Sequence, residues 1–380
     1  MSAIEPFTIS VPQAEIDDLR RRLDHVRWPE KETVGDWSQG APLTKVKALC
    51  DHWRTQYDWR RLESRLNGLG NFRTTIDGLP IHFLHVRSPR ADALPLLMTH
   101  GWPGSVVEFM KVAGPLSDPE SLGGNGSDAF HLILPSLPGY GFSGKPGQTG
   151  WGVHHTADAW VELMKRLGYE HYVAQGGDWG AAVTTALGAM APEGLQAIHL
   201  NMPISFPAPD EKEFTPAEAK KMEEYARFMK EESGYSNQQM TRPQTLGYSL
   251  ADSASGQAAW IYEKFHAWTD CHGEPENILS LDELLDNISF YWFSGTGASS
   301  ARMYWESTAT GFLPVKVNIP TGISIFPKEI LQPSRRWAER NYKNIIHWNE
   351  LDKGGHFAAF EQPGLFVEEL RKCFRPFQRF

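Results

Sequence analysis

Residues 173–180, Val-Ala-Gln-Gly-Gly-Asp-Trp-Gly, constrain the fold of this chain more than any other stretch. The apolar run 171–175 predicts a strand that leads into them, and the Ala- and Leu-rich run 181–190 predicts a helix that follows. Glycines at 176 and 180 let such a strand and helix pack closely around a sharp turn. This turn lifts the side chain of Asp178 out of the predicted sheet.

Asp178 is a candidate nucleophile because of its place in this turn. The Gly-x-Asp-x-Gly spacing is that of a nucleophile elbow in which a carboxylate replaces serine. At the start of a helix, the helix dipole favours the charged and nucleophilic form of the carboxylate. An aspartate that only caps the helix has the same local sequence. Other residues of the chain must therefore decide between the two interpretations.

Short apolar runs alternate with helical segments on both sides of this turn. The continuous apolar run 94–99 is typical of a buried parallel strand, and Asp77-Gly78 predicts a hairpin between two earlier strands. The alternation predicts an α/β fold with a mostly parallel, doubly wound sheet. The predicted strands are 72–76, 81–86, 94–99, 131–134, 171–175, 196–200, 321–326 and 345–348, and the predicted helices among them are 106–116, 157–167, 181–190, 334–340 and 363–372.

The alternation is interrupted after the sixth predicted strand. Residues 203–314 contain helix-like segments at 211–233, 258–268, 281–293 and 298–306, without a clear strand among them, so we predict a helical cap there. Residues 1–70, with helical segments at 13–26 and 43–62, are predicted to wrap the core as an N-terminal extension. The core itself then comprises 71–202 and 315–380.

Charge and cysteine usage narrow the class of protein. The 37 Lys and Arg residues against 46 Asp and Glu residues give a net charge of −9, and no basic run stands out. Nucleic acid and anionic membrane surfaces are therefore not expected as partners. Cys50, Cys271 and Cys373 form no close pair and no zinc spacing, which suits a reducing compartment.

No targeting or membrane segment is evident either. Residues 1–12 lack a basic region followed by an apolar run, and no apolar run is long enough to span a bilayer. We predict a soluble, cytoplasmic protein without a membrane anchor. A homodimer is one option for its assembly, which the sequence leaves open.

Three further features suit an enzyme built on such an elbow. His356, in Gly-Gly-His-Phe after the last predicted strand, gives the chain order nucleophile, acid, histidine of the α/β-hydrolase triad. Glu329, just after the strand 321–326, is the candidate acid that orients the imidazole. Asp352 is a rival, ranked lower because it lies only four residues before His356 in the same turn. Residues 100–103, His-Gly-Trp-Pro, follow a strand end where this fold contributes an oxyanion-hole N–H.

Together these motifs make the chain resemble an epoxide hydrolase of the α/β-hydrolase fold, in the branch that includes the microsomal and fungal enzymes. The residues that carry the resemblance are 100–105, 176–180, 326–329 and 354–361. The likeness extends to the N-terminal extension and the cap, so it covers nearly the whole chain. Microsomal members begin with a membrane anchor that this chain lacks, so membrane attachment is not carried over.

The resemblance implies further site residues. Two cap tyrosines of the family donate hydrogen bonds to the epoxide oxygen, and the matching positions are Tyr235, in Glu-Ser-Gly-Tyr, and Tyr304, in Arg-Met-Tyr-Trp-Glu. The family uses Glu or Asp as the orienting acid, and Glu329 occupies the Glu position. His100, Pro103, Trp305 and Phe357 are the residues expected to line the substrate pocket.

The expected chemistry needs no metal and no organic cofactor. Asp178 would open an apolar epoxide to form an alkyl ester, while protonated phenols donate to the epoxide oxygen. His356, held by Glu329, would then activate water, and the backbone N–H groups of Trp102 and Trp179 would stabilise the oxyanion. The product would be a vicinal diol.

Three other activities remain open at this point. A haloalkane dehalogenase shares the aspartate, the histidine and a tryptophan after the nucleophile, but it needs halide-binding donors in place of the phenols. A serine esterase is disfavoured by the aspartate at position 178. A non-catalytic relative that binds a ligand would keep the fold and lose turnover.

Overall fold

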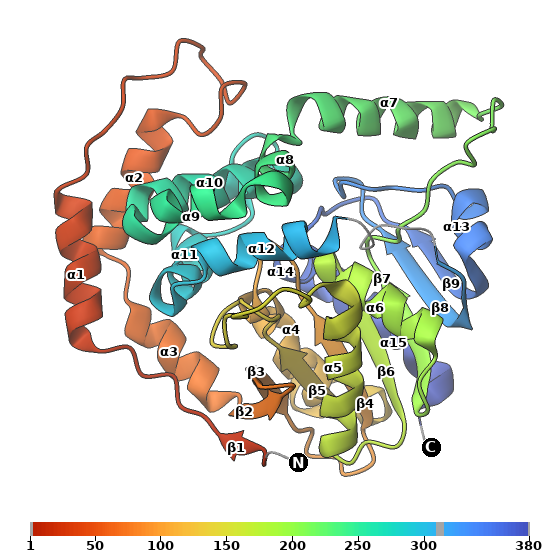
Figure 1. Cartoon of the computed structure of the whole chain (residues 1–380). Coiled ribbons are helices and arrows are strands. Elements are labelled where there is room, and N and C mark those ends of the chain that lie inside the picture. The colour runs from red at the N-terminus through yellow and green to blue at the C-terminus, as the bar shows by residue number, and fades with distance from the viewer. Residues whose placement is uncertain (1–2, 309–314, 379–380) are drawn as a thin grey trace.

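Nine strands form one sheet in the computed structural model, which describes residues 3–308 and 315–378 (Figure 1). Their order is β1-β2-β3-β5-β4-β6-β7-β8-β9. The pairs β1–β2, β2–β3 and β3–β5 are antiparallel, and the neighbours from β5 to β9 are parallel, which confirms the predicted mostly parallel sheet. The strands are β1 Glu5–Pro6, β2 Asn71–Ile76, β3 Leu79–Val86, β4 Leu94–Thr99, β5 Phe130–Pro135, β6 Tyr172–Gly176, β7 Leu195–Leu200, β8 Val317–Ile325 and β9 Tyr342–Glu350.

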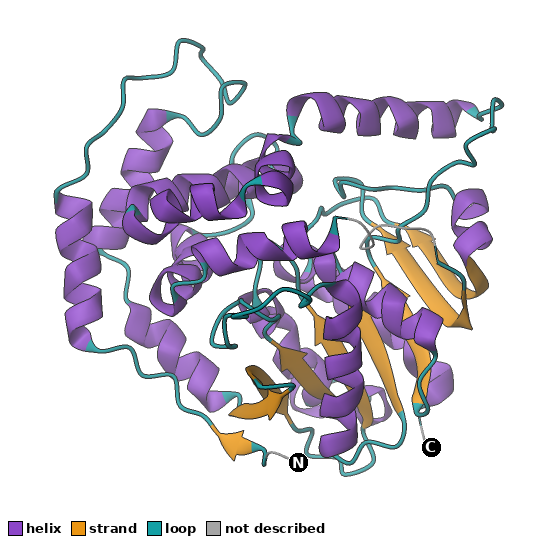
Figure 2. Cartoon of the chain, in the orientation of Figure 1, coloured by secondary structure: helices purple, strands orange, loops and turns teal. Residues whose placement is uncertain are grey.

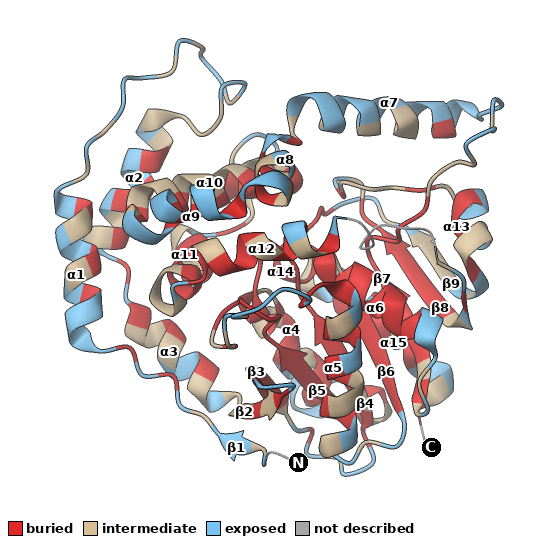
Figure 3. Cartoon of the chain, in the orientation of Figure 1, coloured by how far each residue is buried: buried red, intermediate tan, exposed pale blue. Residues whose placement is uncertain are grey.

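Helices cover both faces of this sheet (Figures 1 and 2). Helices α5 and α6 pack on each other and on one face, while α4 and α15 pack on each other and on the opposite face. The central strands are therefore buried on both sides, which explains their almost continuous apolar sequences (Figure 3). The helices of this part are α4 Met110–Ser117, α5 Val153–Arg166, α6 Trp179–Met190, α13 Arg335–Asn341, α14 Ala358–Glu361 and α15 Pro363–Phe374.

Six helices lie between β7 and β8 in the described part of the chain, above the sheet in Figure 1. Two of them, α8 and α9, were not predicted. Helix α8 has no clear apolar face, whereas α9 buries Pro243, Gly247 and Leu250 at helical spacing and was overlooked. The predicted helix 211–233 begins only at Pro216, since the Thr215 side chain and Glu218 form a capping box there. The six are α7 Pro216–Glu231, α8 Gly234–Thr241, α9 Pro243–Asp252, α10 Ala254–Trp268, α11 Leu281–Ser294 and α12 Gly297–Ser307. The predicted end of the cap, at residue 314, lies outside the described residues.

The N-terminal segment contacts both the sheet and these helices. Its strand β1 pairs with β2 at the sheet edge, a strand that the sequence analysis missed because it has two exposed residues and no apolar alternation. The six strands predicted before the cap thus correspond to β2–β7. The predicted helical stretch 43–62 is wrong as a single helix, since the Asp58 side chain accepts from Arg60 N–H and starts a new helix. The helices are α1 Gln13–Asp24, α2 Leu43–Thr55 and α3 Trp59–Gly68.

Several polar contacts fix the N-terminal helices against the cap, and two of them are buried. Trp53 Nε1 donates to Ser289 Oγ at 2.8 Å, and the Tyr57 hydroxyl donates to Asp286 Oδ1 at 2.9 Å. The described 3-10 turns are Val106–Phe109 (η1), Glu120–Leu122, Gly126–Asp128, Pro275–Asn277 and Arg375–Phe377. The carboxyl ends of β4, β6, β7 and β8 meet at one edge of the sheet, beneath the cap, which is where ligands bind in open α/β sheets.

Candidate active site

Asp178 lies in a strained turn between β6 and α6. Its backbone angles are φ +50° and ψ −127°, a conformation that is uncommon for any residue with a side chain. The turn also needs its glycines for close packing. A Cβ atom at Gly180 would lie 1.9 Å from the Thr99 carbonyl oxygen, and one at Gly176 would lie 2.1 Å from the Gly180 oxygen. The predicted elbow is therefore present as a close strand-to-helix turn.

One oxygen of Asp178 is held by the backbone of a neighbouring loop. The Trp102 N–H, three residues after the end of β4, donates to Asp178 Oδ1 at 2.7 Å. Trp179 is the first residue of α6, so its N–H belongs to the set at a helix N-terminus that has no partner within the helix. Both tryptophans are buried. The Trp102 N–H thus points at the position where charge would develop on this carboxylate.

His356 connects Glu329 to the other oxygen of Asp178. Its Nδ1 lies 2.6 Å from Glu329 Oε1, and its Nε2 lies 3.3 Å from Asp178 Oδ2. All three side chains are buried, although they come from loops that follow β6, β8 and β9. Asp352, the alternative acid, is exposed in the turn before His356. The structure therefore brings Asp178, Glu329 and His356 together, with Glu329 rather than Asp352 on the imidazole.

The charges around His356 favour its protonated form. Burial opposes a charged imidazole, but the neighbouring charges and hydrogen bonds of Glu329 and Asp178 outweigh it and hold the pKa of His356 well above its usual range. Part of this effect depends on the negative charge of Asp178. Any reaction that neutralises Asp178 would therefore lower the pKa of His356.

Glu329 is fixed by more than its bond to His356. The Ile330 N–H donates to Glu329 Oε1 at 2.7 Å, and Asn201 Nδ2 lies 3.4 Å from Glu329 Oε2. Asn201 is in turn fixed by Gln175 Nε2, which donates to its Oδ1 at 2.9 Å. The sequence analysis missed Asn201, although its place directly after the predicted strand 196–200 was a usable signal, because that end of a parallel strand faces the site.

The cap contributes two buried tyrosines on the opposite side of Asp178. The Tyr235 ring of α8 stacks on Trp102 with centroids 5.1 Å apart, and the Tyr304 ring of α12 meets Trp179 edge-on at 4.8 Å. The two phenol rings are 5.9 Å apart. Burial, together with the charge of Asp178, raises the pKa of both phenols well above the usual value, so both stay protonated.

Comparisons with known proteins agree with this arrangement. The family model "Epoxide hydrolase N terminus" matches residues 4–109, and the model "alpha/beta hydrolase fold" matches residues 95–255. A Stigmatella aurantiaca protein, whose own assignment as an epoxide hydrolase is provisional, is 58% identical over 98% of this chain and 85% of the relative. Epoxide hydrolase 1 of Oryctolagus cuniculus is 36% identical over 97% of this chain and 88% of its own length. The chain belongs to the epoxide hydrolase family.

A solved structure supports the same family and the α/β-hydrolase fold. The epoxide hydrolase of Aspergillus niger superposes with a TM-score of 0.88 and 31% identity, covering 98% of this chain and 96% of the fungal one. The enzyme is thus an epoxide hydrolase, as the motifs predicted. No helix in the described ranges is both long and apolar enough to cross a membrane.

The cavity next to Asp178 in this epoxide hydrolase is small. Its volume is about 20 Å³, and its lining includes Asp178, His356, His100 and Phe357. A cavity needs roughly 10–15 Å³ to hold a water molecule, so there is room for about one. His100 is fixed there, because its Nε2 accepts from Leu137 N–H at 3.2 Å.

The structure does not bring the other two predicted pocket residues to this cavity. Pro103 uses its carbonyl oxygen to accept from Asn287 Nδ2 at 2.7 Å, and it is absent from the cavity lining. Trp305 is 48% exposed and lines a separate cavity on the outer side of α12. It follows Tyr304 directly, and successive residues of a helix point in directions about 100° apart.

Glu108 is a second residue that the sequence analysis missed. It lies in η1 and lines the cavity beside Asp178 and His356. Burial raises the pKa of Glu108 to about 8. Ser105 caps η1, and the Glu108 carboxyl interacts with the Ser105 backbone N–H, so the Ser-x-x-Glu spacing of a capping box was the available signal.

Proposed function

We propose that this epoxide hydrolase works in two steps, with Asp178 as the nucleophile. In the first step, Asp178 Oδ2 attacks an epoxide carbon, the carbon–oxygen bond of the ring breaks, and an alkyl ester forms. Oδ2 is the attacking atom because Oδ1 accepts from the Trp102 N–H and is placed to become the ester carbonyl oxygen. The strained elbow directs the carboxylate towards the cap, where the epoxide would be held.

Tyr235 and Tyr304 protonate the leaving oxygen in this proposal. An alkoxide is a poor leaving group, so a donor within hydrogen-bonding reach lowers the barrier for ring opening. Both phenols are protonated at neutral pH because burial and Asp178 raise their pKa. The Tyr304 hydroxyl is buried, and it interacts with the Tyr235 hydroxyl and with the Trp179 side chain, so the two phenols lie close enough to act on one oxygen.

His356 activates water in the second step. Esterification removes the negative charge of Asp178, which lowers the pKa of His356. The imidazolium then gives its Nε2 proton back to the phenolate left by ring opening, and the neutral imidazole can take a proton from water. The resulting hydroxide attacks the ester carbonyl carbon, and the Trp102 and Trp179 N–H groups stabilise the oxyanion. Collapse of this intermediate releases the diol and restores the carboxylate. Glu329 keeps Nδ1 protonated throughout, so that Nε2 is the atom that accepts the proton.

The observation that carries this proposal is that the two oxygens of the Asp178 carboxylate contact different groups. One oxygen contacts a backbone N–H at 2.7 Å and the other faces His356 Nε2 at 3.3 Å. A covalent ester followed by attack at its carbonyl uses both contacts in turn. Family membership favours this chemistry over the dehalogenase, esterase and binding-protein alternatives. A cytoplasmic location and a homodimer stay predictions from the sequence.

Single-turnover hydrolysis of styrene oxide in 18O-labelled water tests the two steps. We expect the first diol to contain no label, because its new oxygen comes from Asp178. Later turnovers should release labelled diol, and mass spectrometry of the protein should find 18O in the peptide that contains Asp178. Full label in the first diol would mean that water attacks the epoxide directly, and the ester mechanism would be wrong.

A further inference from the structure

Ring opening would move one negative charge from the sheet side of the site to the cap. Before the reaction this charge lies on Asp178, which faces the Trp102 N–H and His356. Once Asp178 is an ester and a phenol has given its proton to the epoxide oxygen, the charge lies on the phenolate. A buried phenolate is costly unless a positive charge lies close to it. The cap should therefore hold a cation beside one of the two phenols.

Lys264, on α10, provides a buried cation beside Tyr235. Its Nζ lies 4.6 Å from the centroid of the Tyr235 ring and 5.4 Å from that of the Trp268 ring. The residue is 2% exposed, and lysines are almost never buried to that extent unless they are paired. Its pair is Glu263, whose Oε1 accepts from Nζ at 2.9 Å. An ammonium is attracted to the face of an aromatic ring at such distances, so Lys264 also helps to orient Tyr235.

The other phenol, Tyr304, has a different environment. Of the cations that lie over aromatic rings in the described part of the chain, none faces the Tyr304 ring. Burial raises the pKa of both phenols, but an interaction with the Tyr304 hydroxyl opposes this rise for Tyr235. For Tyr304, the negative charge of an ionised Tyr235 adds to the effect of burial and raises the pKa further. Tyr235 therefore loses its proton more readily than Tyr304.

We propose that Lys264 stabilises the phenolate form of Tyr235, which makes Tyr235 the proton donor and leaves Tyr304 to donate a hydrogen bond. This inference rests on the proposed function. Lys264 is a positioning residue, since it acts through Tyr235 rather than on the epoxide itself. As Asp178 forms its bond to the epoxide carbon, the electron pair of the breaking carbon–oxygen bond goes to the oxygen, which takes the Tyr235 proton. Tyr235 keeps the electron pair of its O–H bond until His356 returns a proton to it.

Two carboxylates near Lys264 do not cancel its charge at the ring. Glu232 and Glu263 line a cavity that also includes the exposed residues Gln39 and Glu231. The Glu263 side chain is 27% exposed, against 3% for that of Lys264, so water screens the carboxylate more than the ammonium. Burial raises the pKa of Glu232, which disfavours its charged form. The ammonium is therefore the charge that acts most directly on the Tyr235 ring.

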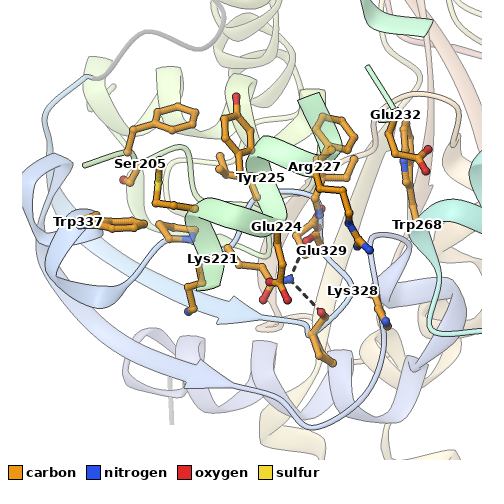
Figure 4. A pocket seen from close by; sticks show the side chains of 18 of the residues that line it. Ser205, Lys221, Glu224, Tyr225, Arg227, Glu232, Trp268, Lys328, Glu329 and Trp337 are labelled. Carbon is orange, nitrogen blue, oxygen red and sulfur yellow. Dashed lines mark hydrogen bonds between the residues drawn. The ribbon is translucent and has the colours of Figure 1, made fainter. Parts of the chain in front are cut away.

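Other cations near the site face different cavities. Three of them line a cavity of about 260 Å³ between α7 and the loop that follows β8, together with Trp268 (Figure 4). The lining of that cavity includes neither Tyr235 nor Tyr304. Arg302, two residues before Tyr304 in α12, lines a cavity on the outer side of that helix. Lys264 is thus better placed than these to act on a phenol. The three cations are Lys221, Arg227 and Lys328.

Neutral substitutions of Lys264 test the proposal. Lys264→Met keeps the length of the side chain and removes its charge, Lys264→Gln removes the charge but keeps a donor for Glu263, and Lys264→Arg keeps the charge. Lys111→Met is the matched control, because Lys111 Nζ lies 4.8 Å from the Phe360 ring and 2.6 Å from Glu283 Oε1, away from the phenols. Stopped-flow, single-turnover reactions with styrene oxide give the rates of alkylation and of ester hydrolysis for each protein.

We expect Lys264→Met and Lys264→Gln to slow alkylation by about tenfold or more, because the phenolate loses its neighbouring cation. Ester hydrolysis should change little, and Lys264→Arg and Lys111→Met should keep most of the alkylation rate. The effect of Lys264→Met should shrink to about threefold or less in a Tyr235→Phe background, where residue 235 has no proton to give, and persist in a Tyr304→Phe background.

The double variants separate a role in charge stabilisation from one in packing, since phenylalanine keeps the ring that the ammonium contacts. Equal slowing by Lys264→Met in the wild-type and Tyr235→Phe backgrounds would mean that Lys264 only packs on the ring, and the inference would be wrong. Unchanged alkylation in both neutral variants, with Tyr235→Phe still slow, would refute it and leave the proposed function intact. Wild-type alkylation by Tyr235→Phe itself would overturn the proposed role of that phenol as well.

Discussion

The two sides of the catalytic centre are held in different ways. On the sheet side, Asp178, Glu329 and His356 are fixed by hydrogen bonds to one another and to the backbone. On the cap side, Tyr235, Tyr304 and Trp268 are held mainly by contacts between aromatic rings. Ring contacts are weaker and less directional than charge-assisted hydrogen bonds, so the cap side can rearrange while the sheet side keeps its geometry.

This difference matches what each side would have to do. The reacting carboxylate and its base need fixed positions, because small misplacements in a catalytic site cost large factors in rate. The cap must instead separate its rings to admit a substrate, since the Trp102, Tyr235 and Tyr304 rings pack on one another with centroids 5.1 to 5.9 Å apart. Removal of a sheet-side group should therefore abolish a chemical step, and changes on the cap side should be graded.

Asp178→Ala should have the largest effect. Loss of the nucleophile should lower turnover by about 10⁴-fold or more, because no other side chain is placed to form the ester. Hydrolysis of styrene oxide, followed by chromatography of the diol, measures this. Asp352→Ala is the matched control and should retain activity, since Asp352 is exposed and Glu329 occupies the imidazole. Substantial diol formation by Asp178→Ala would show that the carboxylate is not the nucleophile.

His356→Gln should separate the two steps. Ring opening should continue, while ester hydrolysis slows by about 10³-fold or more without the base. The ester should accumulate, and intact-protein mass spectrometry should detect a mass increase equal to that of the substrate, located on Asp178 by peptide mapping. If no adduct forms while ring opening is retained, the role of His356 in the second step must be rejected.

The tyrosines should give smaller, graded effects. Tyr235→Phe or Tyr304→Phe alone should slow ring opening by roughly 10–10²-fold, because the remaining phenol still donates, and the double variant should lose about 10³-fold or more. Stopped-flow measurement of the alkylation step is the readout. Tyr248→Phe, which alters a cap tyrosine that is 71% exposed, is the control. Equal alkylation rates in all four proteins would exclude the phenols from the mechanism.

Sequence patterns predicted the sheet side better than the cap side for a physical reason. Asp178, Trp102 and Glu329 each lie within a few residues of a strand end, so local spacing alone places them at one edge of a parallel sheet. A polar residue directly after a strand, such as Asn201, carried the same signal and was overlooked. The order and register of the strands then bring the residues that follow different strands close together.

In the cap, no comparable local pattern indicates which residues face the site. Helix α8, which carries Tyr235, has no clear apolar face and was not predicted. In α12, Tyr304 faces the site while the next residue, Trp305, is half-exposed on another surface. Which side of a cap helix faces the sheet depends on how six helices and the N-terminal segment pack together, and that is set by contacts distant in sequence.

Glu108→Gln should have the smallest effect on activity and should instead change the pH dependence of stability. Folding raises the pKa of Glu108 from 4.5 to about 8, so the folded state binds this proton more tightly than the unfolded state. Wild-type stability therefore falls as pH rises between these values, and the neutral amide removes that loss. Relative to wild type, the free energy of unfolding of Glu108→Gln should rise by on the order of 2 kcal/mol between pH 6 and pH 9.

Glu283, which forms a capping box at the start of α11, provides the matched control for this prediction. Glu283 caps α11 with Ser280, and although burial opposes its charged form, Lys111 holds the pKa of Glu283 below its usual range. Glu283 is then ionised in both the folded and unfolded states from pH 6 to pH 9, so Glu283→Gln should shift stability equally at both values. Urea unfolding of the three proteins at the two pH values measures this. If the free energy of unfolding changes with pH in the same way in both variants, Glu108 is not held protonated beside Asp178 and His356.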